Sequence, residues 1–477
     1  MITKKDLVRV FVKGGILSPG DFLKIIKTAN KLGSDSIHFG SRQDILFPVK
    51  NYSKEDLDKT FDSIQTNYEI NQESYQNIVS SYVALDVLPR KSWLAPHIYH
   101  YILDSFKYRP KFKINIVDPS QSLVPLFTGN LNFVASSQDN YWFLYLRFSE
   151  IDPNPWKFPA LIYGFDLAKV AEFMESLDFK SQKIPYEDLY SLITKTLKIN
   201  LQTRMEEMNF PDSNFPYYEG LNSTPDGKYW LGLYWRNNKF DTTCLRAICE
   251  RCIKTNVGKV SLTPWKSIII KGIEEKYRIG WEKLLGRFGI NMRHSSLELN
   301  WHLPVLDTEA LNLKNYLVRE MDKMDISTYG LTFSIKNDPA MVPFTSVVIE
   351  KNFTPDSNPG ESYNILFSKE FNANLMEYDY YTKNVSKDII PPLLLELSYL
   401  YYEQLDEKQK VEKETGPKNN QKTLNILYQC KNCLTIYDER IGDEINGIKP
   451  GVAFEKLPNT YECPLCGSDK KGFSKIS

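Results

Sequence analysis

Two stretches of the chain share one order of apolar runs and polar breaks. In residues 6–48 an apolar run, Leu7–Val12, precedes a Gly-Gly turn, an amphipathic stretch, Pro19–Lys31, and a second apolar run, Ser36–Phe47. Apolar positions three and four apart predict a helix, and short β-branched runs predict strands. The pattern therefore predicts a strand–helix–strand unit whose second strand carries a polar interruption, residues 40–44.

Residues 228–271 repeat this order 223 residues later and without gaps. A strand is predicted at Tyr229–Trp235, a helix at Thr242–Lys254 and a second strand at Lys259–Ile270, again with a polar interruption at 263–267. Self-similarity at a fixed distance is the sign of an internal repeat, although two ordinary units can also match by coincidence. We interpret the match as a two-fold repeat.

Each unit is followed by short aromatic and β-branched runs, which are typical of strands. The strands predicted after the first unit are Phe112–Val117, Leu131–Ala135 and Tyr141–Phe148, and those after the second are Leu331–Ile335, Thr345–Glu350 and Tyr363–Phe367. The body is therefore predicted to be an α+β structure made of two similar halves.

The charged segment 403–423 separates this body from the C-terminal residues. It has few aliphatic residues, and Gly416-Pro417 ends any helix that enters it. The predicted repeat units are residues 1–75 and 216–290, and the lobes that follow them are 76–215 and 291–402. The linker is 403–423, and a small C-terminal domain is predicted at 424–477.

Charge and composition exclude several classes of partner. The chain has 59 basic and 59 acidic residues, so its totals indicate neither nucleic-acid binding nor a membrane surface. The N-terminus has no apolar signal core, and the most apolar stretch, Ile389–Tyr402, is short and broken by Pro391 and Pro392. Seven clustered cysteines fit a reducing compartment better than a disulfide framework. We predict a cytoplasmic protein with no membrane segment.

The strongest chemical signal is a pair of Cys-x-x-Cys motifs near the C-terminus. Cys430 and Cys433 form the first, Cys463 and Cys466 the second, with 29 residues between them. Two such motifs can place four thiolates at the corners of a tetrahedron, which suits one iron or zinc ion. The sequence therefore predicts a four-cysteine metal site.

Three further cysteines lie on the predicted helix of the second unit. Cys249 and Cys252 are on adjacent turns, and Cys244 is two turns from Cys252. Such a patch could ligate a cluster if a fourth ligand came from elsewhere. Alternatively, cysteine is a small apolar residue that suits the buried face of a helix. The sequence leaves both interpretations open.

The C-terminal domain resembles rubredoxin. The shared residues include Tyr437-Asp438, the loop 446–451, Phe454, Leu457-Pro458 and the knuckle from Cys463 to Gly467. The resemblance implies one iron ion, Fe²⁺ or Fe³⁺, in the four-cysteine site. Leu434 stands where the family usually has glycine, and Tyr461 where it usually has tryptophan. Spacing alone would favour a zinc ribbon that only holds a fold, whereas the loop 446–458 and the knuckle from Cys463 to Gly467 favour iron.

The body resembles the sirohaem-dependent nitrite and sulfite reductases. Ser41-Arg42-Gln43 and Thr263-Pro264-Trp265 are similar to the family's two cleft turns, and Asn77–Ser80 and Arg109–Ile114 to its next two segments. The resemblance implies two ferredoxin-like half domains in a pseudo-two-fold body. It also implies an anion or tetrapyrrole cleft that contains Arg42, Asn77, Lys111 and Lys113. Alternatively, the two lysines protect a solvated edge strand.

Other positions depart from the reductase pattern. From Lys254 to Gln429 the chain has no cysteine, so the family's four-iron cluster cannot assemble there. Phe11 and Gln76 replace two arginines that bind anions in the family. These departures favour a body that has lost its redox centre, and they leave a sirohaem possible but without its usual electron route.

The predicted function is one-electron transfer by a rubredoxin tethered to a degenerate reductase-like body, which docks a redox partner protein or a tetrapyrrole. An electron carrier is favoured over a catalyst, and if the chain is an enzyme it is an oxidoreductase of the nitrite/sulfite reductase type. Two alternatives stay open. One is an active sirohaem-dependent reductase with an atypical electron route, and the other is a zinc-stabilised structural protein.

Overall fold

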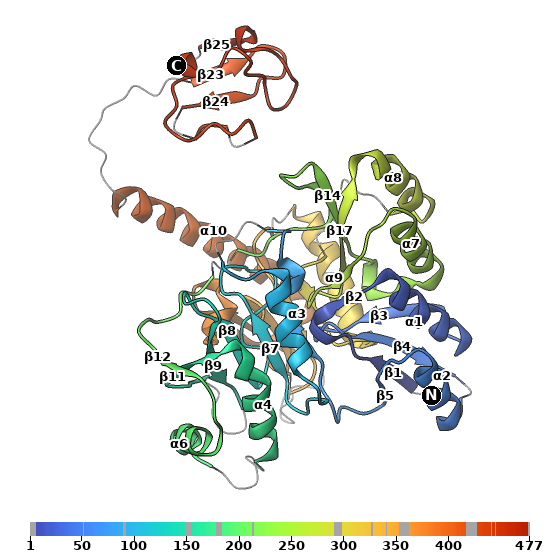
Figure 1. The fold of residues 1–477 in the computed structure, drawn as a ribbon. Helices are drawn as coiled ribbons and strands as arrows, with labels where there is room; N and C mark the ends of the chain where they lie inside the picture. The colour runs from blue at the N-terminus through green and yellow to red at the C-terminus, as the bar shows by residue number, and fades with distance from the viewer. Residues whose placement is uncertain are drawn as a thin grey trace. The chain divides into compact units, whose positions relative to one another are not determined.

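The structure is a computed structural model, in which the chain divides into two compact units, Met1–Leu405 and Asp406–Ser477. It describes residues 6–50, 52–88, 92–148, 155–177, 184–211, 214–290, 298–325, 328–339, 341–352, 362–415, 427–439, 441–443 and 445–475. Figure 1 shows the order of the elements. No helix within these ranges has the length and apolar character needed to cross a membrane.

The first repeat unit forms a five-stranded sheet in the order β15-β3-β4-β1-β5, in which β15 (Phe240–Asp241) comes from the second repeat unit. The helix α1 has the predicted bounds, and Ser18 caps it because its hydroxyl accepts a hydrogen bond from the Asp21 N–H at 3.0 Å. The elements of this unit are β1 (Asp6–Val10), β2 (Ile16–Leu17), α1 (Pro19–Lys31), β3 (Ser36–Phe39), β4 (Ile45–Val49), α2 (Lys54–Ser63) and β5 (Tyr68–Ile70).

The second repeat unit forms a sheet in the order β13-β14-β17-β16-β2. Its helix α7 also has the predicted bounds, and Asp241 caps it at the position equivalent to Ser18. The elements are β13 (Gly220–Ser223), β14 (Lys228–Leu233), β15 (Phe240–Asp241), α7 (Thr242–Lys254), β16 (Val260–Leu262), β17 (Ile268–Glu274) and α8 (Arg278–Arg287).

The two units exchange one short strand each. The strand β2 of the first unit pairs with β16 of the second, and β15 of the second pairs with β3 of the first. The helices α1 and α7 pack against each other (Figure 1), and one hydrophobic core contains residues of both units. The half domains are therefore parts of one folded body.

The backbone supports the repeat residue by residue. Positive φ angles occur in pairs that are 223 residues apart: Gly14 with Asn237, Gly15 with Asn238, Gly33 with Asn256, and Gln43 with Lys266. Gln43 and Lys266 both have φ 57°. Left-handed backbone is uncommon for residues other than glycine, so coincidence does not account for these matches.

One prediction in each unit is wrong in detail. The runs 36–47 and 259–270 are not single interrupted strands, because β3 pairs antiparallel with β4 and β16 with β17. The polar residues between them are hairpin turns. The left-handed residue in each turn reverses the chain, which hydrophobic periodicity does not reveal.

The two lobes share a topology as well. In each sheet two neighbouring pairs are parallel and the next is antiparallel: β6-β7-β8-β9 in the first lobe and β18-β19-β20-β21 in the second. A helix connects the first parallel pair in both, α3 (Pro96–Ser105) and α9 (Thr308–Lys323). The right-handed crossover that parallel strands require explains these helices.

The remaining bounds of the first lobe are β6 (Ile78–Ser80), β7 (Ile114–Val117), β8 (Leu131–Ala135), β9 (Tyr141–Leu146), β10 (Trp156–Lys157), β11 (Ala160–Tyr163), α4 (Leu167–Ser176), α6 (Tyr186–Thr196) and β12 (Leu201–Thr203). Those of the second lobe are β18 (Trp301–His302), β19 (Phe333–Lys336), β20 (Val347–Lys351), β21 (Ser362–Ser368), β22 (Tyr378–Ser386) and α10 (Ile390–Thr415).

Helix α10 extends into the predicted linker and ends at Thr415, directly before Gly416-Pro417. Residues 403–415 are mostly Glu, Gln, Lys and Leu, which are good helix formers, so their charge does not prevent a helix. The rest of the linker, 416–423, lies outside the described residues. The C-terminal unit forms a three-stranded sheet in the order β24-β23-β25, with β23 (Leu427–Cys430), β24 (Ile436–Asp438) and β25 (Phe473–Lys475).

Candidate metal centre and predicted cleft

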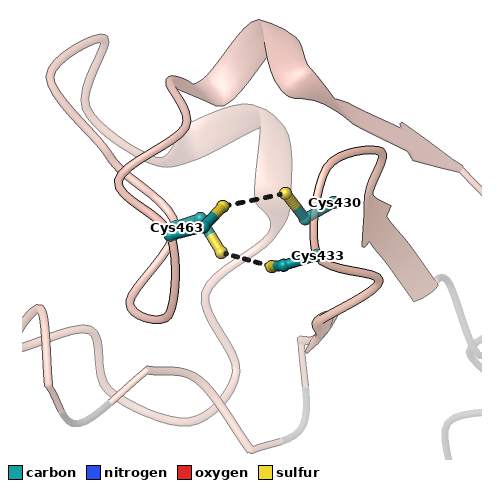
Figure 2. Close-up of side chains that lie close together, drawn as sticks. Cys430, Cys433 and Cys463 are labelled. Atoms are coloured by element: carbon teal, nitrogen blue, oxygen red, sulfur yellow. Dashed lines mark hydrogen bonds between the residues drawn. The ribbon is translucent and has the colours of Figure 1, made fainter.

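The four cysteines of the C-terminal unit converge on one point. Their sulfur atoms all lie within 4.8 Å of one another. The Cys430 and Cys466 sulfurs are 3.6 Å apart, and those of Cys433 and Cys463 are 3.5 Å apart. Figure 2 shows the side chains of Cys430, Cys433 and Cys463 close together. A tetrahedral ion with metal–sulfur bonds of about 2.3 Å needs sulfurs nearly 4 Å apart, so the arrangement fits one zinc or iron ion.

The two Cys-x-x-Cys loops, which we call knuckles, have the same hydrogen bonds. The Cys430 N–H donates to the Thr435 carbonyl at 2.8 Å, and the Cys463 N–H to the Ser468 carbonyl at 2.7 Å. In each knuckle the residue after the second cysteine is left-handed, with φ 64° at Leu434 and 71° at Gly467. Leu434 therefore adopts the conformation that favours glycine, and its side chain is 65% exposed.

The knuckles also set the charge of the thiols. Backbone N–H groups of Cys433 and Asn432 lower the pKa of Cys430 to about 6. The hydroxyl and N–H of Thr435 lower the pKa of Cys433. Burial raises the pKa of Cys463 to about 11, so a bound cation is needed to hold all four residues as thiolates at neutral pH.

An aromatic core surrounds the site. The Phe454 ring contacts the rings of Tyr428, Tyr437, Tyr461 and Phe473. Tyr461, which replaces the family's usual tryptophan, is buried and donates its hydroxyl to Asp443 Oδ2 at 2.8 Å. A unit of this size depends on its metal for much of its stability, and this core holds the knuckles in place.

The other three cysteines do not form a metal site. Cys244, Cys249 and Cys252 are completely buried in the core that the two repeat units share. Burial raises the pKa values of all three thiols, to about 12 for Cys244 and Cys252. Within the described ranges, the four knuckle cysteines are the sole group of three or more His, Cys, Asp or Glu side chains that converge for a metal.

Two of the predicted cleft residues hold the body together. Arg42 is 9% exposed and donates to Asn115 Oδ1 at 2.6 Å and to the carbonyls of Asn77 and Ile114 at 2.8 and 2.7 Å. The Asn77 side-chain amide donates to the carbonyls of Val12, Arg42 and, at 3.0 Å, Gln43. Both side chains thus make hydrogen bonds within the body. Burial lowers the pKa of Arg42 to about 9.

The two predicted lysines lie elsewhere on the first lobe. Strand β7 begins at Ile114, so Lys111 and Lys113 precede this strand and are not part of it. Both side chains are exposed. Their backbone N–H groups are fixed by Glu175 and Asn130, at 2.9 Å each, and these bonds hold the chain out of the strand.

The second cleft turn is filled by an aromatic side chain. Trp265, 223 residues after Arg42, is 3% exposed and donates its indole N–H to the Leu123 carbonyl at 2.8 Å. Its ring contacts Phe215 and Phe344, with centroids 4.6 and 5.5 Å away. Together with the inward Arg42 and Asn77, this packing does not fit a tetrapyrrole held by its carboxylates between the two turns.

Among the described residues, Asn77 lines the smaller of two cavities found in the body, whereas Arg42, Lys111 and Lys113 line neither of them. The larger of the two, about 920 Å³, has Asp118, Asp139, Glu206 and Glu207 among its described lining residues, and Glu207 is ion-paired with Lys157 and Arg204. The smaller, about 170 Å³, is lined by Phe11 and Gln76 and by the cationic residues Lys13, Lys107 and Arg109.

Sequence reasoning missed the polar residues around the sulfurs. The Thr435 hydroxyl lies 3.0 Å from Cys433 Sγ, and the Ser468 hydroxyl 3.1 Å from Cys466 Sγ. Asn432 Nδ2 donates to Ser468 Oγ at 2.7 Å. The signal was present, because a hydroxyl residue follows the second cysteine by two positions in both motifs.

The rubredoxin family matches residues 427–473. The chain is 34% identical over 87 residues to High molecular weight rubredoxin of Moorella thermoacetica, covering 17% of this chain and 37% of that protein. It is 48% identical over 48 residues to Rubredoxin-1 of Pseudomonas putida, covering 10% and 27%. It is 49% identical over 49 residues to Probable Rubredoxin-2 of Methanocaldococcus jannaschii, covering 10% and 87%. The chain thus spans well under half of the first two relatives.

The body is similar in fold to a solved structure. The Mycobacterium tuberculosis NirA protein superposes with a TM-score of 0.61 at 14% identity, over 82% of this chain and 79% of that chain. At this identity the likeness concerns the fold alone. The predicted fold is thereby confirmed: the chain carries a C-terminal rubredoxin domain at residues 427–473, and its body has a nitrite/sulfite reductase-like fold.

Proposed function

We propose that the chain is a one-electron carrier whose rubredoxin domain binds iron and whose body docks a redox partner. The convergence of four cysteine sulfurs within 4.8 Å supports this most directly. Four protein ligands fill every position of a tetrahedron, so no position is open for a substrate. With iron bound, such a site would exchange electrons and would not bind and convert a small molecule.

The site residues have separate tasks. Bound iron would supply the exchange of one electron between its ferric and ferrous forms. Cys430 and Cys463 are buried and hold the ion from the inside, whereas Cys466 is exposed and Cys433 half-buried. The side of the site that Cys466 occupies is therefore the one a partner can approach. Leu434 and Leu465, in the same two knuckles, are 65% and 75% exposed and would contact that partner.

For the body we propose partner recognition without a redox centre of its own. Arg42 and Asn77 are engaged in internal hydrogen bonds, and Trp265 packs against aromatic rings. The chain has no cysteine between Lys254 and Gln429 to ligate a cluster. These observations favour a reductase-like scaffold over an active reductase.

A visible absorption spectrum with metal analysis of the full chain, purified from its native host, tests this proposal. One iron per chain and ferric thiolate bands that bleach on reduction are expected. An additional tetrapyrrole band would overturn the proposal in favour of a sirohaem-dependent reductase. A colourless, zinc-loaded protein would overturn it in favour of a structural role.

A further inference from the structure

Each knuckle brings one side-chain hydroxyl to its outer cysteine. The Thr435 Oγ1 is 3.0 Å from Cys433 Sγ, and the Ser468 Oγ is 3.1 Å from Cys466 Sγ. These cysteines are the more exposed member of each pair, while the inner ones, Cys430 and Cys463, are buried. The two contacts are therefore equivalent, and both are made to the cysteine of the pair that is more exposed to solvent.

In the metal-bound site the hydroxyl must donate. A metal-bound thiolate has no hydrogen, so the contact can only be an O–H···S⁻ bond. Asn432 fixes this direction for Ser468, because its amide donates to Ser468 Oγ at 2.7 Å and leaves the hydroxyl hydrogen for Cys466. The amide belongs to the first knuckle and the serine to the second, so the orientation is shared between the two knuckles.

Hydrogen bonds to a charged acceptor strengthen as the acceptor becomes more negative. Four thiolates with Fe³⁺ carry a total charge of −1, and uptake of one electron makes it −2. Each donated hydroxyl therefore stabilises the reduced site more than the oxidised one. Hydrogen bonds to ligand sulfurs are a known means by which a protein sets the potential of its iron.

We propose that Thr435 and Ser468 are positioning residues that raise the reduction potential of the iron through O–H···S bonds, and that Asn432 orients the second of them. The inference rests on the proposed function, since it needs iron in the site. It adds specific residues to that function, which the cysteine ligands alone do not define.

The test is a spectroelectrochemical titration of the iron-loaded full chain and its variants. Thr435→Val removes the hydroxyl and keeps the shape, and Ser468→Ala removes the other. At a fixed applied potential each single variant is expected to lower the ferrous-to-ferric ratio about threefold, and the double variant about tenfold, which for one electron equals about 59 mV. The sulfur-to-iron charge-transfer bands are expected to move to lower energy, because the thiolates lose a hydrogen bond.

Matched variants separate donation from structure. Thr435→Ser retains a hydroxyl and is expected to keep the wild-type potential. Asn432→Ala is expected to shift the potential less than Ser468→Ala does and to add nothing to it in the double variant. The effect of Asn432→Ala on the potential is expected to add fully to that of Thr435→Val. A purely structural role would not produce this pattern.

The outcomes are distinguishable. If wild-type protein holds no iron, the proposed function fails. If wild type and variants bind iron equally but share one potential and one set of band positions, the hydroxyl inference fails and the proposed function stands. If Thr435→Val does not hold iron, the partly exposed Ser468 and the exposed Asn432 decide the question by the same criterion.

Discussion

The chain has three Cys-x-x-Cys motifs, and the structure gives them two different environments. Cys249 and Cys252 lie on helix α7, where the backbone N–H groups donate to the carbonyls of the preceding turn. In the knuckles the chain turns, and N–H groups point at the sulfurs instead. Burial then raises the pKa of Cys252 to about 12, whereas the knuckle lowers that of Cys430 to about 6. The motif alone therefore does not specify a metal site; the backbone around it does.

The largest difference between the two environments is expected in iron binding when one cysteine is replaced. Cys463→Ala removes one of four ligands, and metal binding contributes on the order of 10 kcal/mol to such a domain. We expect the variant to lose its iron colour and the C-terminal domain to become sensitive to protease. Visible absorption and limited proteolysis measure both effects.

Cys252→Ala is the matched control for this experiment. It is expected to retain the full iron content and the wild-type spectrum. A loss of iron on this substitution would contradict the separation of the two environments.

A smaller effect is expected from a polar substitution on the helix. Cys252→Ser places a hydroxyl in an apolar core, and a buried group without a partner costs about 1–3 kcal/mol. The free energy of unfolding of the body, measured by urea denaturation, should fall by that amount relative to Cys252→Ala. Equal stabilities of the two variants would mean that the site is polar enough to satisfy the hydroxyl.

The raised pKa of Cys252 also predicts a dependence on alkaline pH. Its thiol stays protonated in the folded state up to about 12, whereas in the unfolded state it ionises near its ordinary value of 9.0. Stability is therefore complete below 9 and is lost as the pH rises toward 12, by about 1.4 kcal/mol per pH unit.

Urea denaturation of wild type and Cys252→Ala at pH 8 and pH 10.5 measures this effect. The wild type should lose about 2 kcal/mol more than the variant over that interval. Parallel losses in the two proteins would show that the thiol ionises equally in both states.

The smallest expected effect is at the knuckle. Leu434 has φ 64°, a conformation that costs an L-residue about 1–2 kcal/mol, while glycine adds about 0.5–1 kcal/mol of unfolded-state entropy. Leu434→Gly should therefore stabilise the iron site by about 0.5–1 kcal/mol and raise the guanidinium concentration at which half of the iron is lost. Leu465→Ala removes a similarly exposed side chain without relieving backbone strain, and it should not produce this gain.

The body shows a second limit of local sequence. The repeat was visible because equivalent residues recur 223 apart, and the bounds of α1 and α7 followed from their caps and periodicity. The positions of Arg42, Lys111 and Lys113 did not follow. The identity of a residue in a motif does not show what its side chain contacts. Arg42 could have faced a ligand, but it donates to three acceptors within the protein.

The amino-acid sequence by itself determined the four metal ligands, the rubredoxin loop and the duplicated strand–helix–strand order, because caps, turns and ligand spacing are formed by residues close together in the chain. Only the tertiary structure decided the rest. It showed the reciprocal strand exchange of β2 and β15, the inward Arg42 beside Asn115, and the contact of Asn432 with Ser468. These arrangements join residues 36 to more than 200 positions apart, and such contacts are set by packing of the whole fold rather than by any local pattern.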